Sequence, residues 1–294
     1  MNRRNFIKTG LAGFAGIAWM NSGANHLRFT IPESILMDKV QLGNTGLNVS
    51  RIALGTGTRG FDQASDQTRM GMEKFVQLAH HAYKRGINFF DMADIYGSHS
   101  YVGNALKSLP REKVVVLSKI WPKEEGSGAR EPVEKTLDRF RMESHLDYFD
   151  ILLIHCMMSG NWHQTYRFYM DALSKAKQKG IVKAVGISCH HIDALSQAAE
   201  NPWVDVIMAR INPFGTFMDG KPEEVKKILD VAKKNGKAII GMKIFGQGNH
   251  VSDEERQQSL QFALTEVKVH AMTIGFDTEA QIDDTVERVN LIVQ

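Results

Sequence analysis

The sequence predicts an α/β protein that forms a closed (β/α)8 TIM barrel with a short N-terminal β-hairpin. From residue 40 onward, short and nearly continuous apolar runs alternate with longer segments of helical periodicity. This pattern is typical of parallel strands that are covered by helices on both faces. About eight such units follow one another without a Pro-, Gly- or Ser-rich linker, and one barrel of roughly 250 residues accommodates them. A doubly wound open sheet is the alternative, because periodicity alone does not separate the two.

The expected strands are the apolar runs, and helical spacing of apolar residues predicts helices between them. The strands cover residues 51–54, 87–92, 113–119, 148–155, 182–188, 204–210, 237–243 and 268–274. Helices are expected, for example, over residues 72–86, 131–142, 166–180 and 222–236. Three of these segments end at a glycine that follows a turn containing Lys or Arg: Gly86, Gly180 and Gly236. A glycine can adopt the left-handed conformation that ends a helix, and a positive charge in the last turn interacts favourably with the helix dipole.

A hairpin is expected before the first strand of the barrel. Asn44, Thr45 and Gly46 separate two stretches in which apolar and polar residues alternate. A short turn between alternating stretches predicts a hairpin. We expect it to close the floor of the barrel.

The first 24 residues resemble an export signal. Arg3, Arg4 and Lys8 precede an apolar run over residues 11–20, and the small residues at 22–24 fit a cleavage site. The paired arginines resemble the twin-arginine signal, whose translocation machinery exports folded proteins. An ordinary secretory signal is the alternative. The apolar run is shorter than the roughly 20 residues of a membrane span, so we expect no stable membrane anchor after cleavage.

These features predict a periplasmic or otherwise exported protein with three parts. Residues 1–24 form the leader, residues 25–37 show no clear period and form a linker, and residues 38–294 form the barrel.

Composition excludes several classes of function. The 294 residues include 36 Lys and Arg against 33 Asp and Glu, and 43% are hydrophobic, so a disordered chain is excluded. The formal charge of +3 belongs to the leader. A nucleic-acid surface needs a basic face on the folded domain, and we therefore expect no nucleic-acid partner. Two cysteines, Cys156 and Cys189, exclude a small fold that depends on several disulfides.

Four polar residues at expected strand ends form a chemically complete set. Catalytic groups of parallel barrels lie at the carboxyl ends of strands, where this chain has Asp91, Tyr96, Lys119 and His155. A nearby ammonium lowers the pKa of a phenol, and a carboxylate holds that ammonium in place. An imidazole orients a substrate carbonyl by hydrogen bonding. The set predicts carbonyl reduction by hydride.

The motifs around these residues resemble those of the aldo-keto reductase family. They are LGNTGLNVSRIALGTG (42–57), FFDMADIYGS (89–98), VVLSKIW (115–121), DILLIH (150–155) and VKAVGIS (182–188). They occur in the family's order and cover nearly the whole chain after the leader. The resemblance implies that Tyr96 is the general acid or base, that Asp91 and Lys119 tune it, and that His155 orients the carbonyl. It also implies a nicotinamide cofactor, NAD(H) or NADP(H).

The resemblance places the cofactor along the loops at the carboxyl ends of the strands. The expected cofactor-binding residues are Gly55, Thr56, Ser188, Cys189, Met208, Met242, Lys243, Phe245, Gly246, Gly275 and Gln281. The run from Gly55 to Gly60 satisfies the spacing of a dinucleotide fingerprint, but no helix pattern begins before about Asp66. A Rossmann unit needs a helix at once, so we interpret this run as the first barrel loop.

Several of these positions depart from the family pattern. Relatives have an asparagine, a glutamine and an aromatic residue where this chain has Cys189, Met208 and Met242. Relatives that bind a 2′-phosphate carry Lys and Arg where this chain has Gly275 and Gln281, among several acidic residues. A phosphate would lack a charged partner there, so we expect NAD(H) to be favoured.

Aromatic residues after strand ends predict a substrate pocket for a small carbonyl compound. They are Phe61, Trp121, Trp162 and Phe214. Aromatic walls suit sugars and apolar carbonyls alike. A sugar or sugar-derived ketone is our preferred substrate because the protein is expected to be exported.

Two other functions are compatible with the sequence. His155-Cys156 and Cys189-His190-His191 end neighbouring strands, and imidazole with thiolate suits zinc or copper. Consecutive strand residues face opposite sides, so His155 and Cys156 both face inward only where the strand bends. We therefore expect no metal. The second alternative is a non-catalytic binding or sensing protein that keeps the reductase scaffold.

Overall fold

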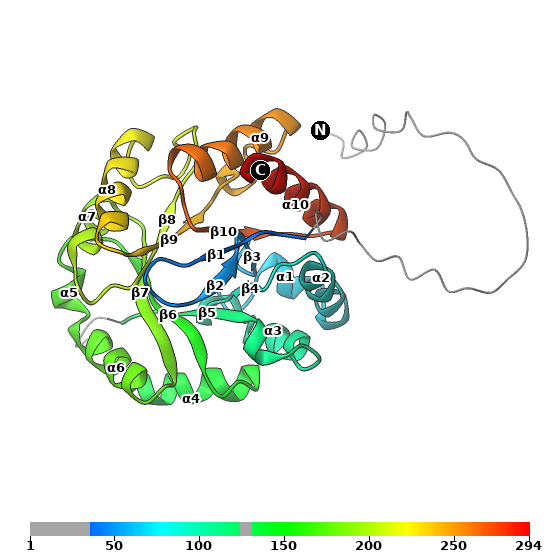
Figure 1. Cartoon of the computed structure of the whole chain (residues 1–294). Helices are drawn as coiled ribbons and strands as arrows, with labels where there is room; N and C mark the ends of the chain where they lie inside the picture. Colours follow the sequence, from blue (N-terminus) through cyan, green and yellow to red (C-terminus); the bar gives the residue numbers. More distant parts are fainter. Residues whose placement is uncertain (1–35, 124–130) are drawn as a thin grey trace, which may run out of the picture. The chain divides into compact units, whose positions relative to one another are not determined.

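A closed barrel of eight parallel strands forms the body of the protein (Figure 1). The computed structural model describes residues 36–123 and 131–294. The strands are β3 (Ile52–Gly55), β4 (Phe89–Asp91), β5 (Val115–Ile120), β6 (Phe149–Met157), β7 (Val182–Cys189), β8 (Val206–Arg210), β9 (Ala238–Met242) and β10 (Ala271–Gly275). The last strand pairs in parallel with the first, with Met272 opposite Ile52. This pairing confirms the TIM barrel and excludes the open sheet.

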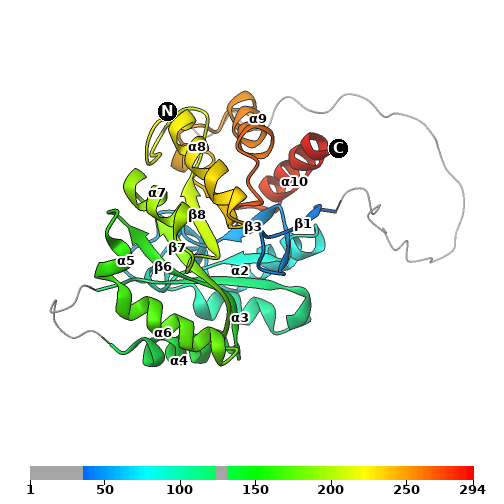
Figure 2. The same ribbon diagram turned by 60° about the vertical axis from the view of Figure 1, so that its left-hand side comes forward.

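Helices surround the strands on the outside of the barrel (Figures 1 and 2). They are α1 (Asp66–Arg69), α2 (Met72–Lys84), α3 (His99–Leu106), α4 (Val133–Ser144), α5 (Trp162–Thr165), α6 (Arg167–Gln178), α7 (Ile192–Glu200), α8 (Pro222–Lys234), α9 (Asp253–Gln261) and α10 (Glu279–Val293). The glycines at 86, 180 and 236 have φ values of 90°, 72° and 74°, as the predicted caps require. α4 ends instead at His145, which adopts a left-handed conformation with a φ of 55°.

The hydrophobic core has two layers, one inside the barrel and one between strands and helices. On β8, Val206 and Met208 belong to the inner layer, whereas Ile207 and Ala209 belong to the outer layer. Alternate residues of a strand face opposite sides, and both sides are apolar here. This arrangement explains why the strands read as continuous hydrophobic runs.

A small antiparallel hairpin closes the amino-terminal end of the barrel, as predicted. β1 (Lys39–Gln41) pairs with β2 (Asn48–Ser50). Leu42 and Leu47 pack with the inner layer of the core, and the Asn44 N–H donates to the Gly236 carbonyl oxygen at 3.0 Å. The chemistry is therefore left to the carboxyl ends of the strands.

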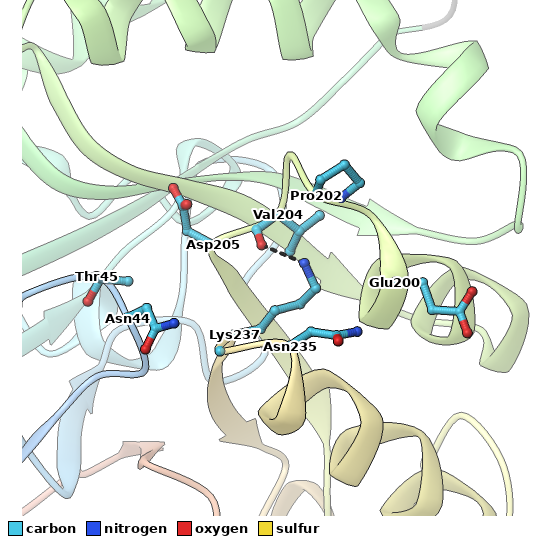
Figure 3. A pocket seen from close by; sticks show the side chains of 9 residues that line it. Asn44, Thr45, Glu200, Pro202, Val204, Asp205, Asn235 and Lys237 are labelled. Carbon is cyan, nitrogen blue, oxygen red and sulfur yellow. Dashed lines mark hydrogen bonds between the residues drawn. The ribbon is translucent and has the colours of Figure 1, made fainter.

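A polar depression of about 420 Å³ lies beside this hairpin, between the starts of β8 and β9 (Figure 3). Asn44, Asp205 and Lys237 are among its lining residues. The Lys237 ammonium donates to the main-chain oxygens of Asn201 (2.5 Å) and Val204 (2.9 Å). Its charged group is thus occupied by the fold itself, and the depression lies at the end of the barrel opposite the predicted site.

The start of the chain is only partly described. The Met37 N–H donates to the Arg85 carbonyl oxygen at 2.9 Å, and Met37 is buried, so the chain packs on the barrel from this residue onward. The predicted leader (1–24) and most of the linker (25–37) lie outside the described residues. Among the residues that are described, no helix has the length and apolar character needed to span a membrane.

Candidate active site

A buried ion pair lies where β4 and β5 end. Asp91 ends β4 and Lys119 lies near the end of β5, and their side chains are 6% and 1% exposed. The Lys119 ammonium donates to the Asp91 carboxylate and, at 2.9 Å, to the Met92 carbonyl oxygen. The Thr273 hydroxyl donates to the second Asp91 oxygen at 2.7 Å. Each charge therefore has an opposite charge and a further hydrogen bond, which buried charges require.

Tyr96 lies directly over this ion pair. It ends a short 3-10 turn (Asp94–Tyr96) that follows β4, and the Lys119 Nζ lies 5.0 Å from the centre of its ring. The loop after β3 packs against the same ring. A Cβ atom on Gly57 would lie 2.3 Å from Tyr96 Cε2, and one on Gly60 would lie 2.4 Å from Cδ1. The Tyr96 ring therefore packs directly against Gly57 and Gly60. A side chain at either position would occupy the space of the ring.

His155, on β6, completes the candidate catalytic group. Its Nε2 lies 3.4 Å from the Tyr96 hydroxyl oxygen, and the two rings are nearly perpendicular at 88°. The Trp121 ring approaches His155 edge-on at 5.2 Å. His155 is buried, whereas Trp121 is 42% exposed. A phenol, an imidazole and an exposed indole therefore meet at the carboxyl end of the barrel.

Burial determines the protonation of the Tyr96 and His155 rings. It lowers the pKa of His155 well below its ordinary value, and the positive charges of Lys119 and Lys243 act in the same direction. Burial raises the pKa of Tyr96, with a further contribution from the Asp91 carboxylate. At neutral pH the imidazole is therefore uncharged and the phenol keeps its proton.

The direction of the Tyr96 pKa shift is opposite to the one predicted from the sequence. The prediction assumed that the Lys119 ammonium would make the phenol more acidic. In the structure Asp91 balances that ammonium, so its charge does not offset the cost of burying a phenolate.

β6 bends immediately after His155. Its pairing with β7 shifts register between Ile154 and Met157, and Cys156 has a φ of 64°. The Cys156 N–H donates to the Ser188 hydroxyl oxygen at 2.8 Å. This is the bend that the sequence required for His155 and Cys156 to face the same side.

The bend creates no metal centre among the described residues. In residues 36–123 and 131–294, no group of three His, Cys, Asp or Glu side chains could hold a metal ion. Cys156 and Cys189 are both free thiols.

Residues 51–288 match the sequence profile of the Aldo/keto reductase family. The chain belongs to this family. It is 26% identical to L-galactose dehydrogenase of Arabidopsis thaliana over 86% of this chain and 89% of the relative. It is also 26% identical to the NADH-specific methylglyoxal reductase of Escherichia coli (strain K12), over 68% of this chain and 65% of the relative.

Solved structures agree on the fold. The holo form of an aldo-keto reductase from Bacillus halodurans superposes with a TM-score of 0.67 at 17% identity, covering 86% of this chain and 91% of that one. Together with the family match, this makes the protein an aldo-keto reductase-type NAD(P)-dependent oxidoreductase.

The residues at the ends of β7 and β9 fit a nicotinamide ring with a reduced set of polar contacts. The Ser188 hydroxyl accepts the Cys156 N–H and keeps its own proton for donation. Met242 is 8% exposed, and its thioether can pack on an aromatic ring. Cys189 departs from the prediction, because it is fully buried in the outer layer of the core, between strands and helices. Met208 is 1% exposed and belongs to the inner layer. Among these four positions of the aldo/keto reductase, Ser188 is therefore the one with a strongly polar side chain.

The other predicted cofactor residues fall into three groups. Thr56 and Gly55 brace the strand ends: the Thr56 hydroxyl donates to the Asp91 carbonyl oxygen at 2.8 Å, and a Cβ on Gly55 would lie 2.8 Å from the Thr273 hydroxyl. Gly275 ends β10 and Gln281 lies in the first turn of α10, where its side-chain oxygen accepts the Asp277 N–H at 2.7 Å.

The loop after β9 holds the remaining predicted cofactor residues. Phe245 is partly buried against the outer layer of the core. Gly246 is buried and has a φ of 54°. Lys243 begins this loop, directly after the last residue of β9.

Three of the four predicted substrate residues line the exposed rim of the barrel mouth. Phe61 is 68% exposed, and Trp121 and Phe214 are each about 40% exposed. Trp162 departs from the prediction, because it is 1% exposed and packs beside Trp203, 6.4 Å away. α5 directs its indole into the outer layer of the core, so it offers no surface to a substrate.

Sequence reasoning missed several residues that shape the site. Thr273 binds Asp91 from the far end of the chain, and only closure of the barrel brings the two together. Gly57 and Gly60 were assigned to a loop without a role. The Gly-x-x-Gly spacing of this loop could have indicated close packing against a ring. A single sequence, however, does not show that the loop folds over Tyr96.

Replacing Gly57 with alanine tests whether its contact with the ring positions Tyr96. The added methyl group must displace the ring, and a displacement of about 1 Å costs on the order of a hundredfold in rate. We expect Gly57→Ala to lower kcat/KM by about this factor for methylglyoxal or glyceraldehyde. In a Tyr96→Phe variant the same substitution should change kcat/KM by less than about threefold, because the hydroxyl that Gly57 would help to position is already absent. An equal loss in both backgrounds would contradict the proposed role.

Proposed function

We propose that this aldo/keto reductase reduces the carbonyl group of a sugar or small aldehyde, or oxidises the corresponding alcohol, with Tyr96 as general acid or base. The observation that carries the proposal is the convergence of the Tyr96 hydroxyl and His155 Nε2, 3.4 Å apart, over the buried Lys119–Asp91 pair. Bound NAD(P)H supplies the hydride in this chemistry.

The residues of the chain account for the proton transfer. A carbonyl oxygen near the Tyr96 hydroxyl and His155 Nε2 receives a hydrogen bond from the phenol and, when the imidazole proton is on Nε2, from His155. As the carbonyl carbon gains a hydride, negative charge develops on this oxygen, and the Tyr96 proton moves to it to give the alcohol. The resulting phenolate lies beside the Lys119–Asp91 pair, with the Lys119 Nζ 5.0 Å from the ring centre. Because the pair does not offset the cost of burying a phenolate, solvent readily returns a proton to it.

The substrate class is supported by the rim of the site and by the relatives. Phe61, Trp121 and Phe214 are exposed aromatic residues, and aromatic rings pack well on sugar rings and on apolar carbonyls. Relatives include enzymes named for L-galactose, methylglyoxal and D/L-glyceraldehyde, all small hydroxylated or carbonyl compounds. A sugar or sugar-derived carbonyl compound agrees with both observations.

A binding or sensing role is the second candidate. Met208 and Met242 favour it, because a thioether is at most a weak hydrogen-bond acceptor for a nicotinamide carboxamide. The complete set of Asp91, Tyr96, Lys119 and His155 favours catalysis.

Removal of the Tyr96 hydroxyl separates the two candidates. We expect Tyr96→Phe to lower kcat/KM for methylglyoxal and glyceraldehyde by about 10²- to 10⁴-fold, the usual contribution of a positioned acid. Tyr101→Phe is the matched control, because this ring packs on Phe75 away from the site, and it should retain activity within about twofold. A wild-type protein that turns over neither probe with NADH or NADPH, yet binds one, would support the binding role.

We further propose that residues 1–24 direct export of the folded protein by the twin-arginine machinery into the periplasm, with NAD(H) already bound. The paired Arg3 and Arg4 and the apolar run support the route. A free nicotinamide pool is not expected outside the cytoplasm, so a retained cofactor would be recycled between two substrates. Asp277 and Glu279 beside Gln281 favour NAD(H) over NADP(H).

Analysis of small molecules released by heat tests this proposal. Protein purified from the exported fraction should release NAD(H) in about equal molar amount. Release of NADP(H) would contradict the cofactor preference, and release of neither would contradict retention through export. The same protein with both arginines replaced by lysine should remain in the cytoplasm.

A further inference from the structure

An ion pair joins the 3-10 turn that carries Tyr96 to a helix on the outside of the barrel. Asp94 begins this turn, and Arg139 lies on α4. The two terminal guanidinium nitrogens of Arg139 donate to the two Asp94 carboxylate oxygens, at 2.9 and 3.1 Å. A bidentate pair of this kind fixes the orientation of both side chains as well as their separation. The turn is therefore held to α4 at a point two residues before the phenol.

Arg139 is in turn held by a chain of hydrogen bonds. Its Nη1 also donates to Glu143, one turn further along α4, at 3.1 Å. The second Glu143 oxygen lies 3.2 Å from Nδ1 of His99, the first residue of α3. The hydrogen bond from His99 lowers the pKa of the Glu143 carboxyl against the opposing effect of burial, and Arg139 lowers it further. Glu143 is therefore ionised at neutral pH and accepts hydrogen bonds from both neighbours.

The chain of hydrogen bonds ends on the strand that carries Lys119. His99 Nε2 lies 2.8 Å from the Ser118 hydroxyl oxygen, and the His99 ring stacks on Phe140 of α4 with 4.2 Å between the ring centres. Ser118 precedes Lys119 on β5, and neighbouring strand residues face opposite sides. Ser118 therefore contacts α3, whereas Lys119 contacts Asp91. Through these bonds α4 is connected both to the turn of Tyr96 and to the strand of Lys119.

Ser118, His99 and Glu143 have the residue types and the order of a hydrolytic triad. A nucleophilic hydroxyl must be accessible to a substrate. Ser118 is 0% exposed and His99 is 1% exposed. The arrangement therefore cannot act on a substrate, and what it can do is hold other groups in place.

The Asp94–Arg139 pair is situated to affect catalysis more than stability. Its two side chains are 17% and 34% exposed, and ion pairs with access to solvent contribute little to the free energy of unfolding. Proton transfer is far more sensitive, because a displacement of about 1 Å costs on the order of a hundredfold in rate. Gly57 and Gly60 limit the position of the Tyr96 ring, whereas Asp94 limits the position of the backbone that carries it.

We propose that Arg139 is a positioning residue that acts through Asp94 to hold the Tyr96 hydroxyl in place for proton transfer. The inference rests on the proposed function, because it assumes that Tyr96 is the acid. Arg139 lies on a helix outside the barrel and reaches Tyr96 only through the turn. It should therefore affect the proton-transfer step without contributing to the binding of the substrate.

Replacing Arg139 tests this role, with Arg141 as a matched control on the same helix. Arg141 is also 34% exposed, but its ion pair with Asp138 lies within α4. We expect Arg139→Met to lower kcat for methylglyoxal with NADH about 10- to 100-fold, with KM within about threefold. Arg139→Lys keeps the charge but not the bidentate geometry, and its kcat should be intermediate. Arg141→Met should retain kcat within about twofold, and both Met variants should keep Tm within about 4 °C of the wild type.

Combined substitutions show whether Arg139 acts through the turn. Arg139→Met together with Asp94→Asn should lower kcat no further than either change alone, because both remove the same ion pair. In a Tyr96→Phe variant, Arg139→Met should change kcat by less than about threefold. Independent losses in these combinations would show that Arg139 acts by another route and would overturn the proposed role.

Amide hydrogen exchange supplies a readout that does not depend on turnover. The Tyr96 N–H donates to the Ala93 carbonyl oxygen at 3.1 Å, and the Gly97 N–H donates to that of Asp94 at 3.2 Å. Arg139→Met should accelerate exchange at these two amides by about tenfold or more, because they open with the turn. Arg141→Met should leave both rates unchanged.

The outcomes distinguish this inference from the proposed function. Unchanged exchange in Arg139→Met, or a wild-type kcat in that variant, would overturn the positioning role and leave the proposed function intact. A wild-type enzyme that reduces neither methylglyoxal nor glyceraldehyde would overturn the proposed function and, with it, the catalytic purpose of the ion pair, even where the exchange rates respond as expected.

Discussion

The ion pair between Asp91 and Lys119 is the interaction on which the site depends. Two charges are held at the boundary between the barrel interior and its mouth, where each is nearly inaccessible to water. Their mutual attraction, the Thr273 hydroxyl and the Met92 carbonyl oxygen together make this burial tolerable. The pair joins the ends of three strands, β4, β5 and β10, and provides the surface over which Tyr96 lies. The catalytic phenol is thus positioned from below by charges and from the side by two glycines.

The fold, and the strand ends that carry Asp91, Tyr96, Lys119 and His155, could be predicted because each depends on local sequence. The strands are apolar on both faces, and these four residues follow them at the ends where parallel barrels place chemistry. What could not be predicted depends on contacts between distant segments. Trp162 follows a strand as a rim residue would, but its turn rotates the indole into the core. The pKa of Tyr96 depends on how completely Asp91 cancels Lys119, which requires the position of both side chains.

A double-mutant cycle on the ion pair tests the central claim most directly. The free energy of unfolding would be measured by denaturant for the wild type, Lys119→Met, Asp91→Asn and the double variant. Removing Lys119 alone leaves a buried, uncompensated carboxylate and should cost about 3–5 kcal/mol, whereas the double variant should recover most of this loss. Additive effects of the two substitutions, or no loss in Lys119→Met, would show that the two charges do not depend on each other and would contradict the account.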